Sequence, residues 1–269
     1  MNAPGTGHPS PYHFREDRRY EPEDVSAFGL LPADNGTRFT VLLAGPFGPL
    51  PDACRRLESV VFSETYGDHR DLLAAEYAAH EESSTFLAVV DRRQGRLAAC
   101  IRLLSGVRPG DLITVRAVLG DAATDDDIRA HHEGFRATKC WDLRLLAVTP
   151  GYRGRTYGSP DVPGDLTPYT GVGMMLYHAA YALARHRGIE HCVTMIDQHA
   201  HRVIRAIGMP MEPFCGRPPR PYQGSAQAYP SYIHVPSVPV VMCEKAPAAK
   251  RVMCDGEGLR GLCGFPELD

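Results

Sequence analysis

The chain has 269 residues, of which 43% are hydrophobic and 23% are charged, and its formal net charge is −3. This composition is that of a soluble globular protein, long enough to bury a sizeable core without disulfides or metals. A net charge this close to zero argues against the basic footprint of a nucleic-acid-binding protein. No apolar run approaches the length of about 18 residues that a membrane span needs, so none is expected.

The cysteines also bear on location. There are eight, scattered along the chain, and four of them lie inside apolar runs that read as strands. Reduced, buried cysteines are distributed in this way in cytosolic proteins. The first twenty residues are polar and rich in proline and charge, unlike a secretory signal peptide. We therefore expect a cytoplasmic protein.

Three regions are expected. Residues 1–37 lack apolar periodicity and predict a flexible N-terminal arm, in which Phe28 and its neighbours could dock locally. Residues 38–245 predict one domain, since no internal boundary or repeat stands out. Residues 246–269 predict an irregular C-terminal tail.

The domain begins with a β-rich run at Phe39–Ala44, which Gly45 and Pro46 end. A helix is expected after Pro51, with Cys54, Leu57, Val60 and Val61 near helical spacing, and a second over Asp71–His80. Two apolar runs, Thr85–Val90 and Leu97–Leu104, are joined by a short polar connection containing glycine. This pattern predicts a β-hairpin.

The segment 105–139 contains a strand-like piece, Leu112–Leu119, and an acidic helix start at Thr124. The strongest strand of the chain follows at Cys140–Val148. After a loop, apolar residues from Val172 to Leu183 recur with helical spacing, which predicts an amphipathic helix that Gly188 ends.

A short strand, Cys192–Ile196, and a helix that Asp197 caps come next. A Pro- and Gly-rich crossing, Met209–Tyr229, leads to a final strand-like stretch, Tyr232–Met242. The strand–helix–strand order over 140–196 requires a right-handed parallel crossover, while the hairpin is antiparallel. We expect an α/β fold, in the sense of an α+β mixed sheet, with helices on its faces.

The residues after the strong strand point to anion binding. Val148-Thr149-Pro150-Gly151-Tyr152-Arg153-Gly154 combines a strand end, glycines and a cation, and a helix beginning near Gly171 follows. Glycine permits close approach of the backbone, and a helix N-terminus offers unpaired N–H groups to phosphate oxygens. A simple turn is the alternative interpretation.

At this point the sequence resembles the GNAT superfamily of acyltransferases, whose motif here is R/Q-x-x-G-x-G/A followed directly by the helix. The chain differs in that residues 155–170 separate Arg153-Gly154 from Gly171-Val172-Gly173. The resemblance implies a single domain with a twisted, mostly antiparallel sheet and a parallel, splayed strand pair at the donor site. It also implies that the acyl donor contacts Leu146, Ala147, Val148, Arg153, Gly154, Gly171, Val172 and Gly173, with backbone N–H groups around Leu146–Val148 holding the oxyanion.

A narrower resemblance covers roughly residues 55–242. It is carried, in order, by Phe62, Glu76-Tyr77, Phe86–Asp91, Ala99–Leu104, Trp141–Leu143 and the C-terminal Ile207–Pro210 followed by Gly216-Arg217. This order is similar to that of the acyl-homoserine-lactone synthases and the N-acyl amino acid synthases. The first group has A-C-x-R-L-L and W-E-x-S-R-F-A-V strands, which correspond to Ala99–Leu104 and Trp141–Val148.

This branch implies substrate contacts for Arg102, Trp141 and Arg144. Arg144 stands one position before the arginine of the family, and therefore faces the other side of the sheet. The acidic cluster of the lactone synthases is present only in part.

Amine acylation requires a proton acceptor, because an alkyl ammonium with a pKa of about 10 is mostly protonated at neutral pH. Asp142 matches the glutamate of the family and is the first candidate for a general base, with a structural salt bridge as the alternative. Glu64 and Glu76 are further candidates. Tyr177 could protonate the leaving thiolate or simply pack in the core.

Other chemistries lack their signatures. The histidines and cysteines show no metal-ligand spacing, and no G-x-S-x-G elbow supplies a serine nucleophile. No metal and no permanently bound cofactor are expected. The crossing at Met209–Tyr229 is basic and aromatic, so Arg217 and Arg220 either contact an acidic acyl carrier protein or belong to a loop over the acceptor pocket.

The sequence thus predicts an N-acyltransferase that moves an acyl group from a CoA or carrier-protein phosphopantetheine thioester to an amine of a small molecule, by direct attack. The high usage of Ala, Arg, Gly and Pro indicates a GC-rich coding sequence, which is compatible with a role in specialised metabolism. The alternatives are a GNAT-fold module that binds an acyl thioester without turnover and a plain acetyl-CoA N-acetyltransferase.

Overall fold

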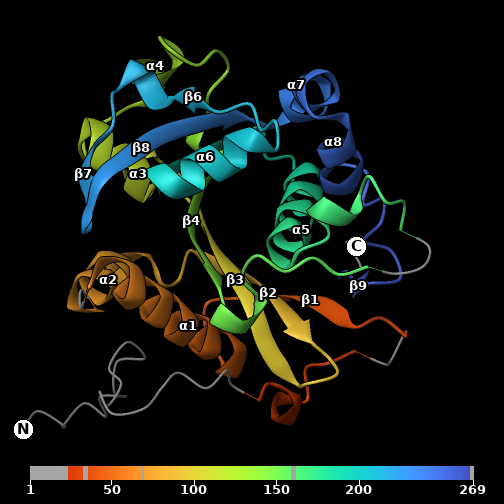
Figure 1. Cartoon of the computed structure of the whole chain (residues 1–269). Coiled ribbons are helices and arrows are strands. Elements are labelled where there is room, and N and C mark those ends of the chain that lie inside the picture. The colour runs from red at the N-terminus through yellow and green to blue at the C-terminus, as the bar shows by residue number, and fades with distance from the viewer. Residues whose placement is uncertain (1–23, 33–35, 68–69, 159–161, 267–269) are drawn as a thin grey trace, which may run out of the picture.

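The computed structural model describes residues 24–32, 36–67, 70–158 and 162–266. Within these residues a nine-stranded sheet has the order β6-β8-β5-β4-β3-β2-β1-β9, and β7 pairs with β8 (Figure 1). The strands are β1 Phe39–Ala44, β2 Ser84–Asp91, β3 Arg96–Ser105, β4 Cys140–Val148, β5 His191–Asp197, β6 Glu212–Pro213, β7 Arg220–Tyr222, β8 Ser225–His234 and β9 Cys263–Gly264.

Helices cover both faces of this sheet, as Figure 1 shows. They are α1 Pro49–Tyr66, α2 Arg70–Tyr77, α3 Ile113–Leu119, α4 Asp125–Arg129, α5 Val172–His186, α6 Gln198–Ala206, α7 Val238–Lys245 and α8 Pro247–Met253.

Side-chain alternation along β2 separates the two faces. Leu87 and Val89 pack in the cluster that contains α5, α7 and α8. Phe86, Ala88 and Val90 pack in the cluster that contains α1. Successive side chains of a strand point to opposite faces, so one apolar strand supplies two cores. The expected mixed α/β sheet with helices on both faces is confirmed.

The parallel pair β4–β5 is short. Its register runs from Cys140 opposite His191 only to Asp142 opposite Val193. The Thr194 hydroxyl then donates to the Leu143 carbonyl at 2.7 Å. Beyond this point β4 continues to pair with β3 as far as Val148, so the edge of β4 that faces β5 leaves the ladder.

Two expected strands are wrong in part. Most of the stretch 112–119 forms α3 rather than a strand: Leu112 is the N-cap residue, and Leu112 and Val115 are buried together with Ile128 and Phe135. A short apolar run cannot be distinguished from a buried helix by periodicity. The final stretch is a strand only as far as His234, and then becomes α7. Proline at 236 removes a ladder donor and fixes φ, which ends the strand.

The C-terminal residues differ from expectation as well. Instead of an irregular tail, 246–266 contains α8, which packs on α5, and β9, which pairs in parallel with β1. Ala249, Val252 and Met253 are buried with helical spacing. A helix of seven residues is too short to be recognised by such a pattern.

The N-terminal arm lies partly outside the described residues, which exclude 1–23 and 33–35. Its described part docks at Val25, whose N–H donates to the Gly95 carbonyl at 2.7 Å and whose side chain is buried against the α1 cluster. Among the helices described, none has the length and apolar character needed to cross a membrane.

Candidate active site

A cavity of about 240 Å³ opens where β4 and β5 diverge. Both strands line it, β4 through Leu143–Ala147 and β5 through Thr194–Asp197. Most other lining side chains are apolar: Val61, Phe62, Ile101, Ala200, Ile204, Met209, Met211, Ala228 and Ile233. The cavity therefore suits an apolar chain whose reactive end meets a few polar groups.

Helix α1 contributes one face to this cavity. Glu58, Val61, Phe62 and Thr65 line it at spacings of three and four residues. These positions lie along one side of an α-helix, which explains why a single helix can form a continuous wall.

Asp142, the expected general base, lies under the cavity and is not among its lining residues. Its carboxylate accepts hydrogen bonds from the Thr114 backbone N–H at 2.6 Å and from the Thr114 hydroxyl at 2.8 Å. Arg144 Nη1 lies 3.7 Å from Asp142 Oδ1. Burial raises the pKa of Asp142, and Arg144 and Thr114 oppose that rise. The geometry matches the salt-bridge alternative.

Arg144 links this buried carboxylate to the cavity, which its side chain lines. Its Nε donates to the Tyr77 hydroxyl at 3.2 Å and its Nη1 to the Thr114 hydroxyl at 3.1 Å. Nη2 donates to Glu76 Oε2 at 3.4 Å and to the Tyr222 hydroxyl at 3.0 Å. The guanidinium is thus held by neighbours on three other elements, α2, α3 and β7.

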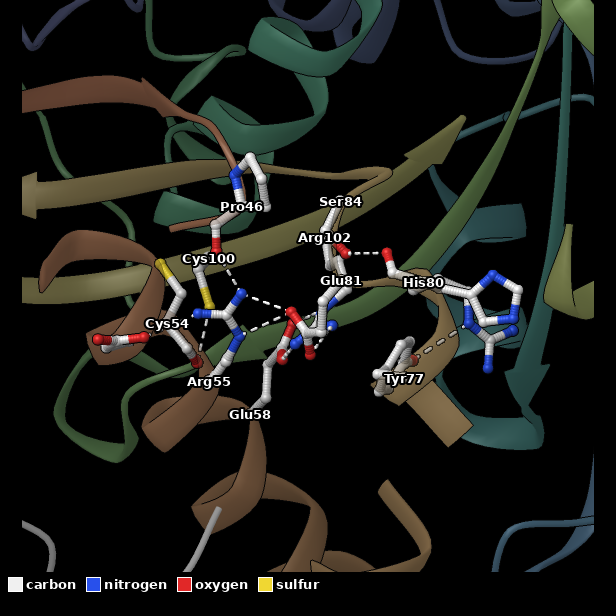
Figure 2. A network of polar contacts seen from close by, with 12 residues as sticks. Pro46, Cys54, Arg55, Glu58, Tyr77, His80, Glu81, Ser84, Cys100 and Arg102 are labelled. Atoms are coloured by element: carbon white, nitrogen blue, oxygen red, sulfur yellow. Dashed lines mark hydrogen bonds and ion pairs between the residues drawn. The ribbon is translucent and has the colours of Figure 1, made fainter. Parts of the chain in front are cut away.

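Arg102 belongs to a second network, in which Arg102 and Glu58 are fully buried and Glu81 is partly exposed (Figure 2). Its Nη2 and Nε donate to both oxygens of Glu58, at 2.6 and 3.2 Å. Its Nη1 reaches Glu81, which also pairs with Arg55. The Arg102 guanidinium lies 4.0 Å from the centroid of the Tyr77 ring. Burial raises the pKa of Glu58, and Arg102 opposes that rise.

The other expected substrate contact, Trp141, is buried in the core on the α5 side of the sheet. Neither Trp141 nor Arg102 lines the cavity, whereas Arg144 does. Of the three residues that the resemblance implied, the structure thus brings one to the cavity.

Arg153 lies at the end of β4, as expected. Its Nε donates to the Val148 carbonyl at 3.0 Å, and its Nη2 pairs with Glu64 at 2.8 Å. Both side chains are more than 40% exposed. Glu64 therefore neutralises Arg153 at the surface and does not line the cavity.

The two halves of the split donor motif meet in space. The Tyr157 N–H donates to the Thr170 hydroxyl at 3.1 Å, which closes the base of the insertion. A Cβ at Gly171 would lie 2.9 Å from the Arg155 carbonyl oxygen, so this position requires glycine for close approach of the backbone. Gly173, in the first turn of α5, has open space around it. Residues 159–161 lie outside the described part of the insertion.

Other expected donor residues divide in a similar way. Leu146 and Ala147 line the cavity, whereas Val148, Gly154 and Val172 do not. Tyr177, the expected proton donor to the thiolate, also lines it. Burial raises the pKa of Tyr177 to about 12, so its hydroxyl keeps its proton at neutral pH.

Sequence reasoning overlooked two cavity residues, Glu58 and Tyr222. Glu58 falls in helical phase with Val61 and Phe62, and this phase was the signal that could have revealed it. Tyr222 belongs to the basic, aromatic crossing, for which a loop over the acceptor pocket is one of the two expectations, but no local pattern distinguishes Tyr222 within it. Arg220 helps to hold this crossing in place by donating to the Ala117 carbonyl at 3.1 Å.

Two smaller expectations can also be compared with the structure. Asp197 caps α6 as predicted, because its Oδ1 accepts the N–H groups of His199 and Ala200 at 2.7 and 3.0 Å. Among the residues that the structure describes, no three His, Cys, Asp or Glu side chains gather as metal ligands.

Comparisons with known proteins agree with this architecture, although no family model matches the chain. It is 26% identical to the acyl-homoserine-lactone synthase of Aeromonas salmonicida over 163 residues, which are 58% of this chain and 67% of that protein. The structure of FeeM, an N-acyl amino acid synthase from uncultured soil microbes, is similar with a TM-score of 0.51 at 15% identity, over 79% of this chain and 97% of that one. The AHL synthase LasI has a TM-score of 0.49 at 15% identity, over 78% and 97% of the two chains.

Proposed function

We propose that this chain acylates an amine of a small molecule. The premise is that the comparisons support a GNAT-like acyltransferase in the branch of acyl-homoserine-lactone and N-acyl amino acid synthases. The donor is a CoA or carrier-protein thioester, and the amine attacks it directly. The observation that carries the proposal is the largely apolar cavity where β4 and β5 diverge. We assign the enzyme to the cytoplasm and to specialised metabolism.

The donor half of the reaction uses β4 and α5. In our proposal the thioester carbonyl lies beside the β4 edge that leaves the ladder, and backbone N–H groups around Leu146–Val148 hold the oxyanion. Gly171 and Gly173 at the start of α5 approach the donor phosphates, because helix N-termini bind anions. Arg153 exchanges Glu64 for a phosphate oxygen. Tyr177 donates a proton to the departing thiolate.

Arg153→Ala tests the donor half. The variant should keep its fold, because both Arg153 and Glu64 are exposed and surface ion pairs contribute little stability. Its dissociation constant for octanoyl-CoA should rise by about tenfold, as expected for a lost charge-assisted hydrogen bond. Glu64→Gln is the matched control and should leave donor affinity unchanged or tighten it. Unchanged affinity in Arg153→Ala would remove Arg153 from the donor site.

The acceptor half uses the polar end of the cavity. Arg144 lines it, and Asp142 acts through Arg144 as a positioning residue rather than as the group that touches the amine. Glu76 contacts both Arg144 and the Tyr222 hydroxyl, so it is the carboxylate that we assign as the final proton acceptor.

A direct assay tests the whole proposal. The purified full chain is incubated with octanoyl-CoA and a set of primary amines, and the release of free thiol and the formation of amide are followed by absorbance and mass spectrometry. We expect amine-dependent thiol release, faster with octanoyl-CoA than with acetyl-CoA because the cavity wall is apolar. An octanoyl carrier protein replaces CoA in a parallel arm to identify the donor. Binding of octanoyl-CoA without thiol release in either arm would refute catalysis and favour a binding module.

A further inference from the structure

The Tyr222 side chain lines the cavity, and the proposed reaction gives its hydroxyl no role of its own. We propose that its hydroxyl faces the acceptor amine and relays the amine's proton to Glu76. This inference rests on the proposed amine acylation and adds to it the group that touches the acceptor.

The β7–β8 hairpin brings Tyr222 to the cavity. Tyr222 pairs with Ser225 at the end of the hairpin, and Gln223 between them has a left-handed backbone with φ of 44°. A non-glycine residue rarely adopts this conformation, and the tight turn directs the preceding side chain over the cavity. Tyr222 and Ser225 both line it.

The Tyr222 hydroxyl belongs to a chain of hydrogen bonds between Arg144 and Glu76. It donates to Glu76 Oε1 and accepts from Arg144 Nη2 at 3.0 Å. The Arg144 guanidinium lies 5.7 Å from the centroid of the Tyr222 ring, and Asp142 and Thr114 hold the guanidinium from beneath. A hydroxyl oxygen can accept more than one hydrogen bond, so a substrate N–H can approach it from the cavity.

The carboxylates around the cavity are less suited to direct contact with the amine. Asp142, Glu64 and Glu76 are not among the lining residues. Glu58 does line the cavity, but both of its oxygens accept from Arg102 and its side chain has 0% exposure. Asp197 also lines it, but its Oδ1 is engaged by two backbone N–H groups of α6. Tyr222 therefore provides the path from the cavity to the Glu76 carboxylate.

Tyr222 acts as a neutral relay rather than as a phenolate base. Burial and the neighbouring Glu76 carboxylate raise the pKa of Tyr222, although Arg144 opposes them. The titratable groups that face its hydroxyl are Arg144 from β4 and Glu76 and Tyr77 from α2. The hydroxyl therefore keeps its proton until the amine replaces it.

The ammonium gives one proton to the Tyr222 oxygen while the Tyr222 proton moves to Glu76, so the amine becomes neutral and Glu76 becomes a carboxylic acid. The amine nitrogen then forms a C–N bond with the thioester carbonyl carbon, whose oxygen becomes an oxyanion. Collapse of the oxyanion breaks the C–S bond, and the thiolate takes a proton from Tyr177. The second proton of the nitrogen then restores the Tyr177 hydroxyl. Glu76 finally releases its proton to water.

Tyr222→Phe tests the relay in the full chain, with octanoyl-CoA as donor and butylamine or methoxyamine as acceptor. Butylamine is protonated at pH 7, whereas methoxyamine is a weakly basic amine that is already neutral. We expect kcat/KM for butylamine to fall by roughly 10²-fold, as for loss of a general base, and to change little for methoxyamine. The loss with butylamine should shrink as the pH approaches about 10, where the amine deprotonates by itself.

Tyr229→Phe is the matched control. Tyr229 lies on the same hairpin and stacks on His201 at 4.2 Å, but it does not line the cavity. This variant should behave like the wild type with both amines. Glu76→Gln should reproduce the Tyr222→Phe profile, and the double variant should lose little more than either single variant.

The outcomes separate the relay from the proposed function. Equal losses with both amines would show a merely structural role for Tyr222 and overturn the relay, as would an unchanged rate with butylamine. In both cases the wild type still acylates amines, so the proposed function stands. Absence of thiol release by the wild type with either amine counts against the proposed function and the relay together.

Discussion

The buried pair of Arg102 and Glu58 makes a demanding prediction about stability. Both side chains have 0% exposure, and two hydrogen bonds of 2.6 and 3.2 Å join them (Figure 2). Arg102→Met keeps the volume of the side chain and leaves Glu58 without its main cationic partner. Loss of one partner of a buried ion pair costs about 3–5 kcal/mol, so we expect a loss of that size in the free energy of unfolding at pH 8.

The loss of stability in Arg102→Met should depend on pH in one direction. Burial already raises the pKa of Glu58 above its ordinary value of 4.5, and Arg102 is the first of the influences that oppose the rise. Without Arg102 the folded-state pKa rises further above the unfolded value. The folded state then binds more protons, so stability is fully present below the unfolded pKa and is lost as the pH rises through the folded pKa. The penalty should therefore be smaller at pH 5 than at pH 8.

Urea unfolding provides the measurement, because Trp141 is the single tryptophan and is buried. The matched control is the double variant Arg102→Met with Glu58→Gln, which removes the stranded charge. It should recover much of the lost stability and flatten its pH dependence, while Glu81 keeps its contact with Arg55. The reasoning fails if the penalty of Arg102→Met is below about 1 kcal/mol, or equal at both pH values and unrelieved by Glu58→Gln.

Three further predictions concern the site. Gly171→Ala should lower the free energy of unfolding by about 1–3 kcal/mol, because the new Cβ clashes with the Arg155 carbonyl. Gly173→Ala, in open space within a helix, should raise the free energy of unfolding by up to about 1 kcal/mol. Equal shifts of the melting temperature in the two variants would contradict this. Ile204→Trp should fill the cavity and lower kcat/KM for octanoyl-CoA relative to acetyl-CoA by at least about tenfold. Val203→Trp, on the exposed side of α6, should leave this ratio unchanged. Competition between the two donors measures the ratio. Asp142→Asn should lower the free energy of unfolding by about 1–3 kcal/mol and should also lower turnover, because it releases Arg144. Intact turnover in this variant would remove Asp142 from the mechanism.

Local pattern predicted the parts of this fold that alternate or repeat clearly. Strand 140–148, the hairpin that precedes it and the helix from Val172 were expected and are present as β4, the β2–β3 pair and α5. Each has a run of apolar residues with a period of two or 3.6, and this period reflects burial of one or both faces. The short apolar run 112–119 and the tail after 246 were misjudged, because a few buried residues are compatible with either kind of element.

The candidate site was likewise predictable only in part. The family resemblance and the helix pattern pointed to Arg144, Leu146, Ala147 and Tyr177, and all four line the cavity. The resemblance placed the catalytic carboxylate at Asp142, which the structure holds beneath the cavity in hydrogen bonds to Thr114. A residue type and its strand position do not reveal which neighbour from another element will occupy its hydrogen-bonding atoms.

By itself, the sequence determined the class of fold and the strand and helix that flank the donor motif, because these depend on interactions between residues close in the chain. Only the tertiary structure decided that the 155–170 insertion closes on itself through Tyr157 and Thr170, so that the split motif is joined in space. Only the tertiary structure brought Tyr222 onto Glu76, which lies 146 residues earlier. Such contacts depend on how whole elements pack, and no periodic pattern in the chain records that packing.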